Sequence, residues 1–202
     1  MEIIMATSNA NKIREIREIL DGTDIRVYSL TDIGIEADID ESGETFEENA
    51  VIKAEAIRKL IADKRNEAIV VADDSGLEID YLGGEPGVHS ARYMEEFPYT
   101  VRNQNLIDRL QGVPDEERTA RFVCAMAIAR PCGETLVFRG EFQGMIAHEP
   151  AGENGFGYDP ILYLPERGCT SAQLSPEEKN AISHRGIVLR TVISELKKIR
   201  QE

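Results

Sequence analysis

Residues 68–76 read AIVVADDSG, and this stretch organises the rest of the chain. Five apolar residues, three of them β-branched, predict a buried strand, and the polar residues that follow them predict a turn. A second strand is expected directly afterwards, over residues 77–82. The sequence therefore places two neighbouring acids, Asp73 and Asp74, at the end of a strand.

These two acids allow two interpretations. Like charges at the end of an apolar strand repel each other, and burial raises that cost. A divalent cation that prefers hard oxygen ligands, Mg²⁺ or Mn²⁺, would relieve the repulsion and carry substrate phosphates on its other positions. A plain turn, in which Asp and Ser side chains bond to the backbone, favours the same residues. The motif alone leaves both interpretations open.

Composition narrows the class of protein. The chain has 202 residues, so one domain or two lobes that share a sheet are expected. Its net charge is −14, so binding to nucleic acid or to an anionic membrane is not expected. Cys124, Cys132 and Cys169 form no Cys-x-x-Cys pair, which favours reduced thiols in the cytosol. We expect no signal peptide and no membrane span.

A first candidate phosphate site lies near the amino terminus. A short strand over residues 2–7 is expected to lead into a helix, with Ser8 or Asn9 as its N-cap. Free N–H groups and the positive end of the helix dipole attract anions, and Lys12 would add a charge. The alternative is a capped helix with an ordinary surface lysine. The chain contains no Walker-type phosphate loop.

A second helix start follows an acidic segment. Thr45 and Glu48 have the spacing of a capping box. Asn49 and Lys53 are four residues apart, so they share a helix face, which we expect near the loop that carries Glu41. A solvated helix face would show the same pattern. The residues predicted to face the core are Phe46, Ala50, Ala54, Ile57 and Ile61.

The middle of the chain changes its pattern. A helix is predicted over residues 100–110, with Val101 among its apolar positions. Residues 121–130 and 135–142 predict a β-hairpin, and residues 145–148 predict a third strand. This block indicates a second lobe that grows from the same sheet.

A glycine-rich loop, GENGFGYDP, occupies residues 152–160. Glycines on both sides of Phe156 indicate unusual backbone angles or a close approach by another group. The ring is either a plate on which a flat ligand stacks, a contact of roughly 1–3 kcal/mol per base, or a plug for the core. Both interpretations remain open.

The last part of the chain predicts two helices. Ser175 as the N-cap, Pro176 at the first position and Glu178 at the third mark the start of the first helix, and Ser183-His184-Arg185-Gly186 opens the second. A single histidine is more often structural than catalytic. The position of His184, next to Arg185 and away from the apolar stripe of the helix, favours a role as a hydrogen-bond donor to a ligand.

Five motifs together resemble the inosine triphosphate pyrophosphatases, which hydrolyse non-standard purine nucleoside triphosphates. They span the chain from end to end, and as a set they are far more specific than any one of them. They are TSNANK (7–12), ESGETFEEN (41–49) with Lys53, ADDSGL (72–77), GFGYDP (155–160), and Lys179 with SHRG (183–186).

The resemblance implies a Mg²⁺-dependent enzyme, with Mn²⁺ as a possible substitute, that converts ITP, dITP and XTP to the monophosphate and pyrophosphate. It implies that Asp74 is the general base and that Glu41, Asp73 and Asp74 bind the metal. The substrate-binding residues that it implies are Thr7, Ser8, Asn9, Ala10, Asn11, Lys12 and Lys53 for the triphosphate, Ser75 beside the base, Phe156, Gly157 and Tyr158 in the stacking loop, and Asp159, Lys179, His184 and Arg185 around the purine.

The resemblance also implies an architecture. We expect an α/β fold whose mixed central sheet extends into two lobes, with flanking helices and an active-site cleft between the lobes, as one domain over residues 1–202. A cytoplasmic homodimer is expected, acting on a small nucleotide and not on nucleic acid or membranes. Two alternatives remain: a pyrophosphohydrolase for another damaged nucleotide, and a nucleotide-binding sensor without turnover.

Overall fold

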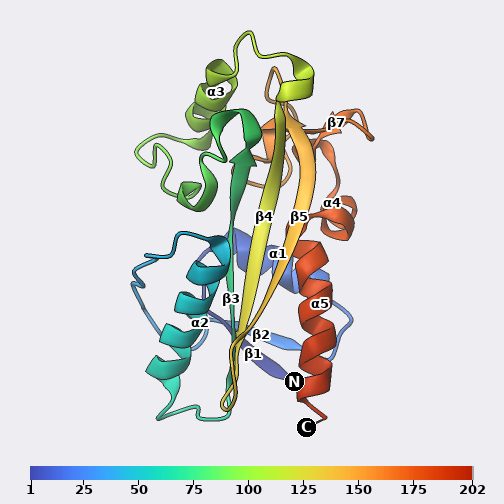
Figure 1. The fold of residues 1–202 in the computed structure, drawn as a ribbon. Coiled ribbons are helices and arrows are strands. Elements are labelled where there is room, and N and C mark those ends of the chain that lie inside the picture. The colour runs from blue at the N-terminus through green and yellow to red at the C-terminus, as the bar shows by residue number, and fades with distance from the viewer. Residues whose placement is uncertain (202) are drawn as a thin grey trace. The chain divides into compact units, whose positions relative to one another are not determined.

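The computed structural model describes residues 1–201, which contain a mixed seven-stranded sheet (Figure 1). β1 pairs in parallel with β2 and β3, whereas β6 pairs antiparallel with β5 and β7. The predicted mixed sheet is therefore confirmed. In their order across the sheet, the strands are β2 (Arg26–Ser29), β1 (Glu2–Met5), β3 (Ile69–Ile79), β4 (Thr119–Ala129), β5 (Leu136–Ile146), β6 (Leu162–Leu164) and β7 (Cys169–Thr170).

Five α-helices flank the strands within the described residues. Capping boxes open two of them, one built from Thr45 and Glu48 and the other from Ser175 and Glu178, and the sequence predicts both. No helix within residues 1–201 is both long and apolar enough to span a bilayer. The helices are α1 (Ala10–Leu20), α2 (Phe46–Ile61), α3 (Tyr99–Arg109), α4 (Pro176–Ile182) and α5 (His184–Ile199).

The chain forms two compact units. Unit 1 consists of Met1–Asp74, Cys124–Gly140 and Arg185–Glu202, and unit 2 consists of Ser75–Val123 and Glu141–His184. β3, β4 and β5 each contribute residues to both units.

The core of unit 1 has helices on both faces of its strands. Ile3, Met5 and Val71 pack with side chains of α1 and α5 in one buried cluster. Successive strand residues point to opposite faces, so Ile4 and Val70 face the other side, where α2 buries its predicted apolar stripe. Figure 1 shows α2 and α5 on opposite sides of the strands of this unit.

Unit 2 has its own core around the other half of β3. Leu77 and Ile79 pack with Leu106 of α3 and with apolar residues of β4, β5 and β6. The prediction for Val101 is wrong, because this side chain is 41% exposed. Arg102 occupies the buried face instead, where its guanidinium donates to three loop carbonyls.

The predicted break in residues 68–82 is also wrong. β3 runs without interruption from Ile69 to Ile79, and both acids lie inside the strand instead of in a turn. Two carboxylates can occupy a strand interior because cationic side chains from other parts of the chain contact each of them.

A similar correction applies to the predicted hairpin. Residues 135–142 and 145–148 are not separate strands, because β5 is continuous from Leu136 to Ile146. Gly144 does not break the strand. A Cβ there would lie 2.6 Å from the carbonyl oxygen of Tyr163, so the glycine allows the neighbouring backbone to approach closely.

Candidate active site

Asp73 and Asp74 point to opposite faces of β3. Side chains alternate along a strand, and the contacts of the two acids follow that rule. Asp73 contacts Cys124, a member of the same core cluster as Val71, whereas Asp74 contacts Lys53 of α2. Two neighbouring residues of one motif therefore belong to two different sets of contacts.

Asp73 is the centre of a buried ionic network. Its Oδ2 accepts hydrogen bonds from Arg185 Nε at 3.1 Å and from the Cys124 thiol at 3.0 Å, and its Oδ1 contacts the ammonium of Lys12. Arg185 also contacts Glu15 of α1. The Asp73 side chain has no exposed surface. The network ties α1 and α5 to β3.

Charge governs the ionisation of this network. Burial opposes ionisation of Asp73, but Arg185 and Lys12 outweigh it and hold the pKa of the carboxyl well below its usual range. Burial and the Asp73 charge raise the pKa of the Cys124 thiol well above its ordinary value. Asp73 is therefore a carboxylate at neutral pH, and Cys124 is a neutral donor to it.

Asp74 faces α2 and has a different environment. Its Oδ1 accepts a hydrogen bond from Lys53 Nζ at 2.8 Å, and Lys53 Nζ lies 3.4 Å from a Glu41 oxygen. The other oxygen, Oδ2, is buried and has no hydrogen-bond partner within residues 1–201. Burial raises the pKa of Asp74 above its usual value, although Lys53 opposes the shift. A buried, basic and unpaired carboxylate oxygen is suited to accept a proton.

The first turn of α1 forms the candidate phosphate site. Asn9 is the N-cap, and its side chain accepts hydrogen bonds from the N–H groups of Asn11 at 3.0 Å and Lys12 at 3.2 Å. Thr7 accepts from the Asn9 N–H at 3.1 Å. The side chains of Thr7 and Asn9 therefore already engage three N–H groups of the candidate phosphate site. The Lys12 ammonium remains the chief cationic group of that site.

A second cluster forms in unit 2 around Asp159. Its Oδ2 accepts from Lys179 Nζ at 2.5 Å and from the N–H of Phe156 at 2.8 Å, and its Oδ1 accepts from Ser171 at 2.6 Å. Lys179 lies 5.3 Å from the centre of the Phe156 ring. At Gly155, where φ is +75°, a Cβ would lie 2.1 Å from Asp159 Oδ2. The glycine-rich loop thus folds onto a buried carboxylate.

Two further predicted residues lie in the same unit. Tyr158 is buried in the core and donates its hydroxyl to the carbonyl of Ser90 at 2.7 Å, so Tyr158 is the aromatic plug of this loop, while Phe156 is half-buried. The His184 ring stacks on Phe122, with ring centres 5.1 Å apart and an interplanar angle of 27°.

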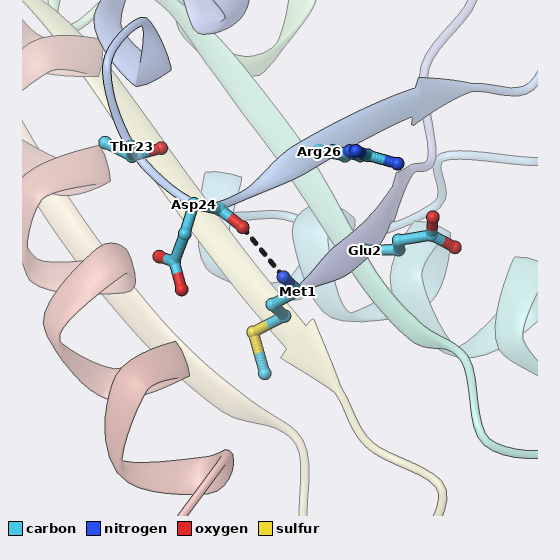
Figure 2. Close-up of a pocket in the computed structure, with 5 residues that line it drawn as sticks. All are labelled: Met1, Glu2, Thr23, Asp24 and Arg26. Atoms are coloured by element: carbon cyan, nitrogen blue, oxygen red, sulfur yellow. Dashed lines mark hydrogen bonds between the residues drawn. The ribbon is translucent and has the colours of Figure 1, made fainter.

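A surface pocket lies elsewhere in unit 1. Met1, Glu2, Thr23, Asp24 and Arg26 line it, and the terminal amine of Met1 donates to the Asp24 carbonyl at 2.7 Å (Figure 2). None of these five residues carries a predicted role.

A model of the Ham1 family matches residues 3–195 of the chain. The chain belongs to the Ham1 family. The chain is 52% identical over 189 residues to a dITP/XTP pyrophosphatase of Geobacillus kaustophilus, and the matched region covers 93% of this chain and 90% of that protein. It is 47% identical over 190 residues to the dITP/XTP pyrophosphatase of Bacillus subtilis, covering 94% and 93% of the two chains. The Ham1 protein of Staphylococcus aureus superimposes with a TM-score of 0.85 at 39% identity, covering 98% of this chain and 99% of that one.

The Ham1 membership confirms the family resemblance, and the contacts of the predicted site residues fall into separate groups. Glu41, Lys53 and Asp74 meet on one face of β3. Asp73 does not join them, and residues 1–201 contain no group of three or more Asp, Glu, His or Cys side chains arranged to hold a metal. Arg185 contacts Asp73 in unit 1, whereas Asp159 and Lys179 pair in unit 2.

Two residues that contact the predicted site residues, Glu15 and Ser171, were not predicted from the sequence. Glu15 lies three residues after Lys12 among the apolar positions Ile13 and Ile16, so an acid on a buried helix stripe was an available signal. Ser171, which donates to Asp159, begins the short 3-10 helix Ser171–Gln173, and the capping box of Thr170 and Gln173 was an available signal for that turn.

Proposed function

We propose that this protein hydrolyses dITP, ITP and XTP to the nucleoside monophosphate and pyrophosphate, and so removes these nucleotides from the cellular pool. The observation that carries the proposal is Asp74, which has a buried, unpaired Oδ2 within the described residues and a raised pKa beside Lys53 and Glu41. The dITP/XTP pyrophosphatases to which the chain is similar over nearly its whole length support the same reaction.

Asp74 acts in this proposal as the general base. Its Oδ2 orients a water molecule and takes a proton as the water attacks the α-phosphorus, and pyrophosphate leaves. Lys53 and Lys12 neutralise charge on the phosphates, since phosphoryl transfer depends on positioning and on electrostatic stabilisation. Thr7, Ser8, Asn9, Ala10 and Asn11 shape the loop that presents Lys12.

The acids fit a divalent cation only in part. Glu41 and Asp74 share a cationic partner, Lys53, so these two carboxylates lie near each other and are our proposed ligands of Mg²⁺ or Mn²⁺, whereas Oδ2 of Asp74 is kept for the water that it deprotonates. A bound cation would supply charge neutralisation for the phosphates and activate water. Asp73, predicted as a third ligand, instead holds Lys12 and Arg185, and we assign it that supporting role.

Unit 2 supplies base recognition. Phe156 stacks on the purine, and the glycines around it allow the loop to fold onto Asp159. We assign hydrogen bonding to the 6-oxo group to His184, whose ring packs on Phe122. Adenine carries an amino group at that position, so a buried donor would be left unpaired, and such a mismatch can reduce turnover by roughly 10⁴-fold.

We also propose that the protein is a cytoplasmic homodimer that binds neither nucleic acid nor membranes. The family resemblance supports the dimer, and the three free thiols and the net charge of −14 support the other two points.

The test is a pyrophosphate-release assay with Mg²⁺ and a panel of dITP, ITP, XTP, GTP, ATP and dUTP. Turnover is expected with the first three nucleotides and at most a trace with ATP. Preferred turnover of dUTP would instead support a pyrophosphohydrolase for another damaged nucleotide. Binding of dITP without pyrophosphate release would support a sensor.

A further inference from the structure

Asn49 is a fully buried amide in the first turn of α2. Its Oδ1 accepts a hydrogen bond from the backbone N–H of Gly43 at 2.8 Å, whereas its Nδ2 is buried without a hydrogen-bond partner in residues 1–201. The Gly43 bond fixes which end of the amide is the oxygen, because a flipped side chain would place two donors against each other. The buried amide therefore holds the loop that precedes α2 against the start of the helix.

Gly43 fits this bond because it has no side chain. A Cβ at this position would lie 2.7 Å from Asn49 Oδ1 and 2.7 Å from Glu48 Cβ, distances that require a shift of the helix start or of the loop. The loop and the first turn of α2 therefore approach more closely than any residue other than glycine permits at position 43.

The capping box extends the same attachment. The Glu48 carboxylate accepts from the N–H of Glu44 at 2.7 Å and of Thr45 at 3.3 Å, next to the Gly43 bond to Asn49. Three consecutive backbone N–H groups are thus bound by side chains of α2, and the chain two residues before Gly43 carries Glu41.

The ion pair of Glu41 is too weak to position it alone. Its oxygen lies 3.4 Å from Lys53, and its side chain is 34% exposed. An ion pair at this distance with a partly exposed carboxylate contributes little, because water screens it and both side chains lose freedom. A bound backbone segment leaves only the Glu41 side chain to be ordered.

We infer that Asn49 is a positioning residue that, through Gly43, holds Glu41 beside Asp74 for a divalent cation. The inference rests on the proposed function, since it takes Glu41 as a metal ligand. Residues that orient metal ligands typically change metal affinity by 10- to 100-fold when they are removed.

The first measurement is amide hydrogen exchange at Gly43 in the full chain. In the parent, the Gly43 N–H is expected to exchange slowly because Asn49 binds it. Asn49→Ala should raise its exchange rate at least tenfold, while the amide of Glu48, which donates to Thr45, keeps its protection. Retained protection of Gly43 in Asn49→Ala would overturn the inference.

The second measurement is Mn²⁺ binding without nucleotide, followed by the loss of the free-ion electron paramagnetic resonance signal. Asn49→Ala and Gly43→Ala should each weaken binding by about tenfold or more. The double variant should lose less affinity than the sum of the two single losses, because both changes break the contact between Gly43 and Asn49, while Gly43→Ala in addition crowds Glu48 Cβ. Ser42→Ala, an exposed change in the same loop, is the matched control and should bind as the parent does.

Glu41→Gln separates this inference from the proposed function. If Glu41→Gln weakens Mn²⁺ binding while Asn49→Ala and Gly43→Ala bind within twofold of the parent, Asn49 does not position the ligand and the inference fails. If Glu41→Gln itself binds Mn²⁺ as the parent does, the proposed metal role of Glu41 fails. Additive losses in the double variant would contradict a shared contact.

Discussion

Asp73 is a residue whose charge the fold requires. Its carboxylate is completely buried and lies between Arg185, Lys12 and the Cys124 thiol. Removing one partner of a buried ion pair leaves the other charge uncompensated, which costs more than the pair itself contributes.

We therefore expect Asp73→Asn to lower the free energy of unfolding by about 3–5 kcal/mol. Urea unfolding followed by circular dichroism measures this change. Asp63→Asn, the same substitution at an exposed acid, is the control and should leave the midpoint unchanged. Equal stability of the two variants would show that the Asp73 charge does not support the fold.

Tyr158 makes a pH-dependent contribution to stability. Its buried hydroxyl donates to the Ser90 carbonyl, and burial, with Tyr99 nearby, raises its pKa above the ordinary value of 10.0. A raised pKa in the folded state gives stability that is complete below pH 10 and is lost as the pH rises above it, because the unfolded phenol ionises first.

Tyr158→Phe should cost about 1 kcal/mol at pH 8 for the lost hydrogen bond. The difference between the variant and the parent should shrink at pH 11, because only the parent loses stability by ionisation of this phenol. Urea unfolding at both pH values tests this, with Tyr81→Phe, which removes the hydroxyl of a tyrosine that is 51% exposed, as the control. A difference that is constant or grows with pH would contradict a buried neutral phenol.

At the scale of elements, the start of α2 contributes both to the stability of the fold and to the geometry of the site. The Thr45 side chain accepts from the Glu48 N–H at 3.1 Å, and the Glu48 side chain returns bonds to the loop. The capping box thus starts the helix and fixes the path of the loop that carries Glu41 where that loop enters α2.

Thr45→Ala should destabilise the protein by about 1 kcal/mol, because it removes an N-cap acceptor. The urea midpoint measures this loss. Thr100→Ala, in the first turn of α3, is the matched control, since Thr100 is exposed and is not the N-cap of its helix. An unchanged midpoint for Thr45→Ala would mean that the cap contributes nothing to the fold.

Local elements were the predictable part of the fold. The capping boxes of α2 and α4 and the apolar stripe of α2 follow from spacings of three and four residues, and the neighbourhood of Glu41 and Lys53 follows from the short loop that carries Glu41 into α2. The continuity of β3 did not, because the residues that compensate its acids are distant: Lys53 is 21 positions from Asp74, and Arg185 is 112 positions from Asp73. Sequence patterns carry little information about such pairs.

At the scale of the whole molecule, strand alternation decides the division of labour. Adjacent acids on one strand cannot point the same way, so Asp73 supports the fold and Asp74 keeps a buried oxygen without a partner in the described residues. The five motifs identify the family because they occur together in one chain. The roles of the two acids became separable only when their contacts were known.

Pyrophosphate release from dITP by Asp74→Asn, compared with the parent and with the Asp63→Asn control, tests the central claim most directly. The substitution keeps the shape of the side chain and removes its basicity, so turnover should fall on the order of 10²- to 10⁴-fold while the urea midpoint confirms a folded protein. Undiminished pyrophosphate release by Asp74→Asn would contradict the account.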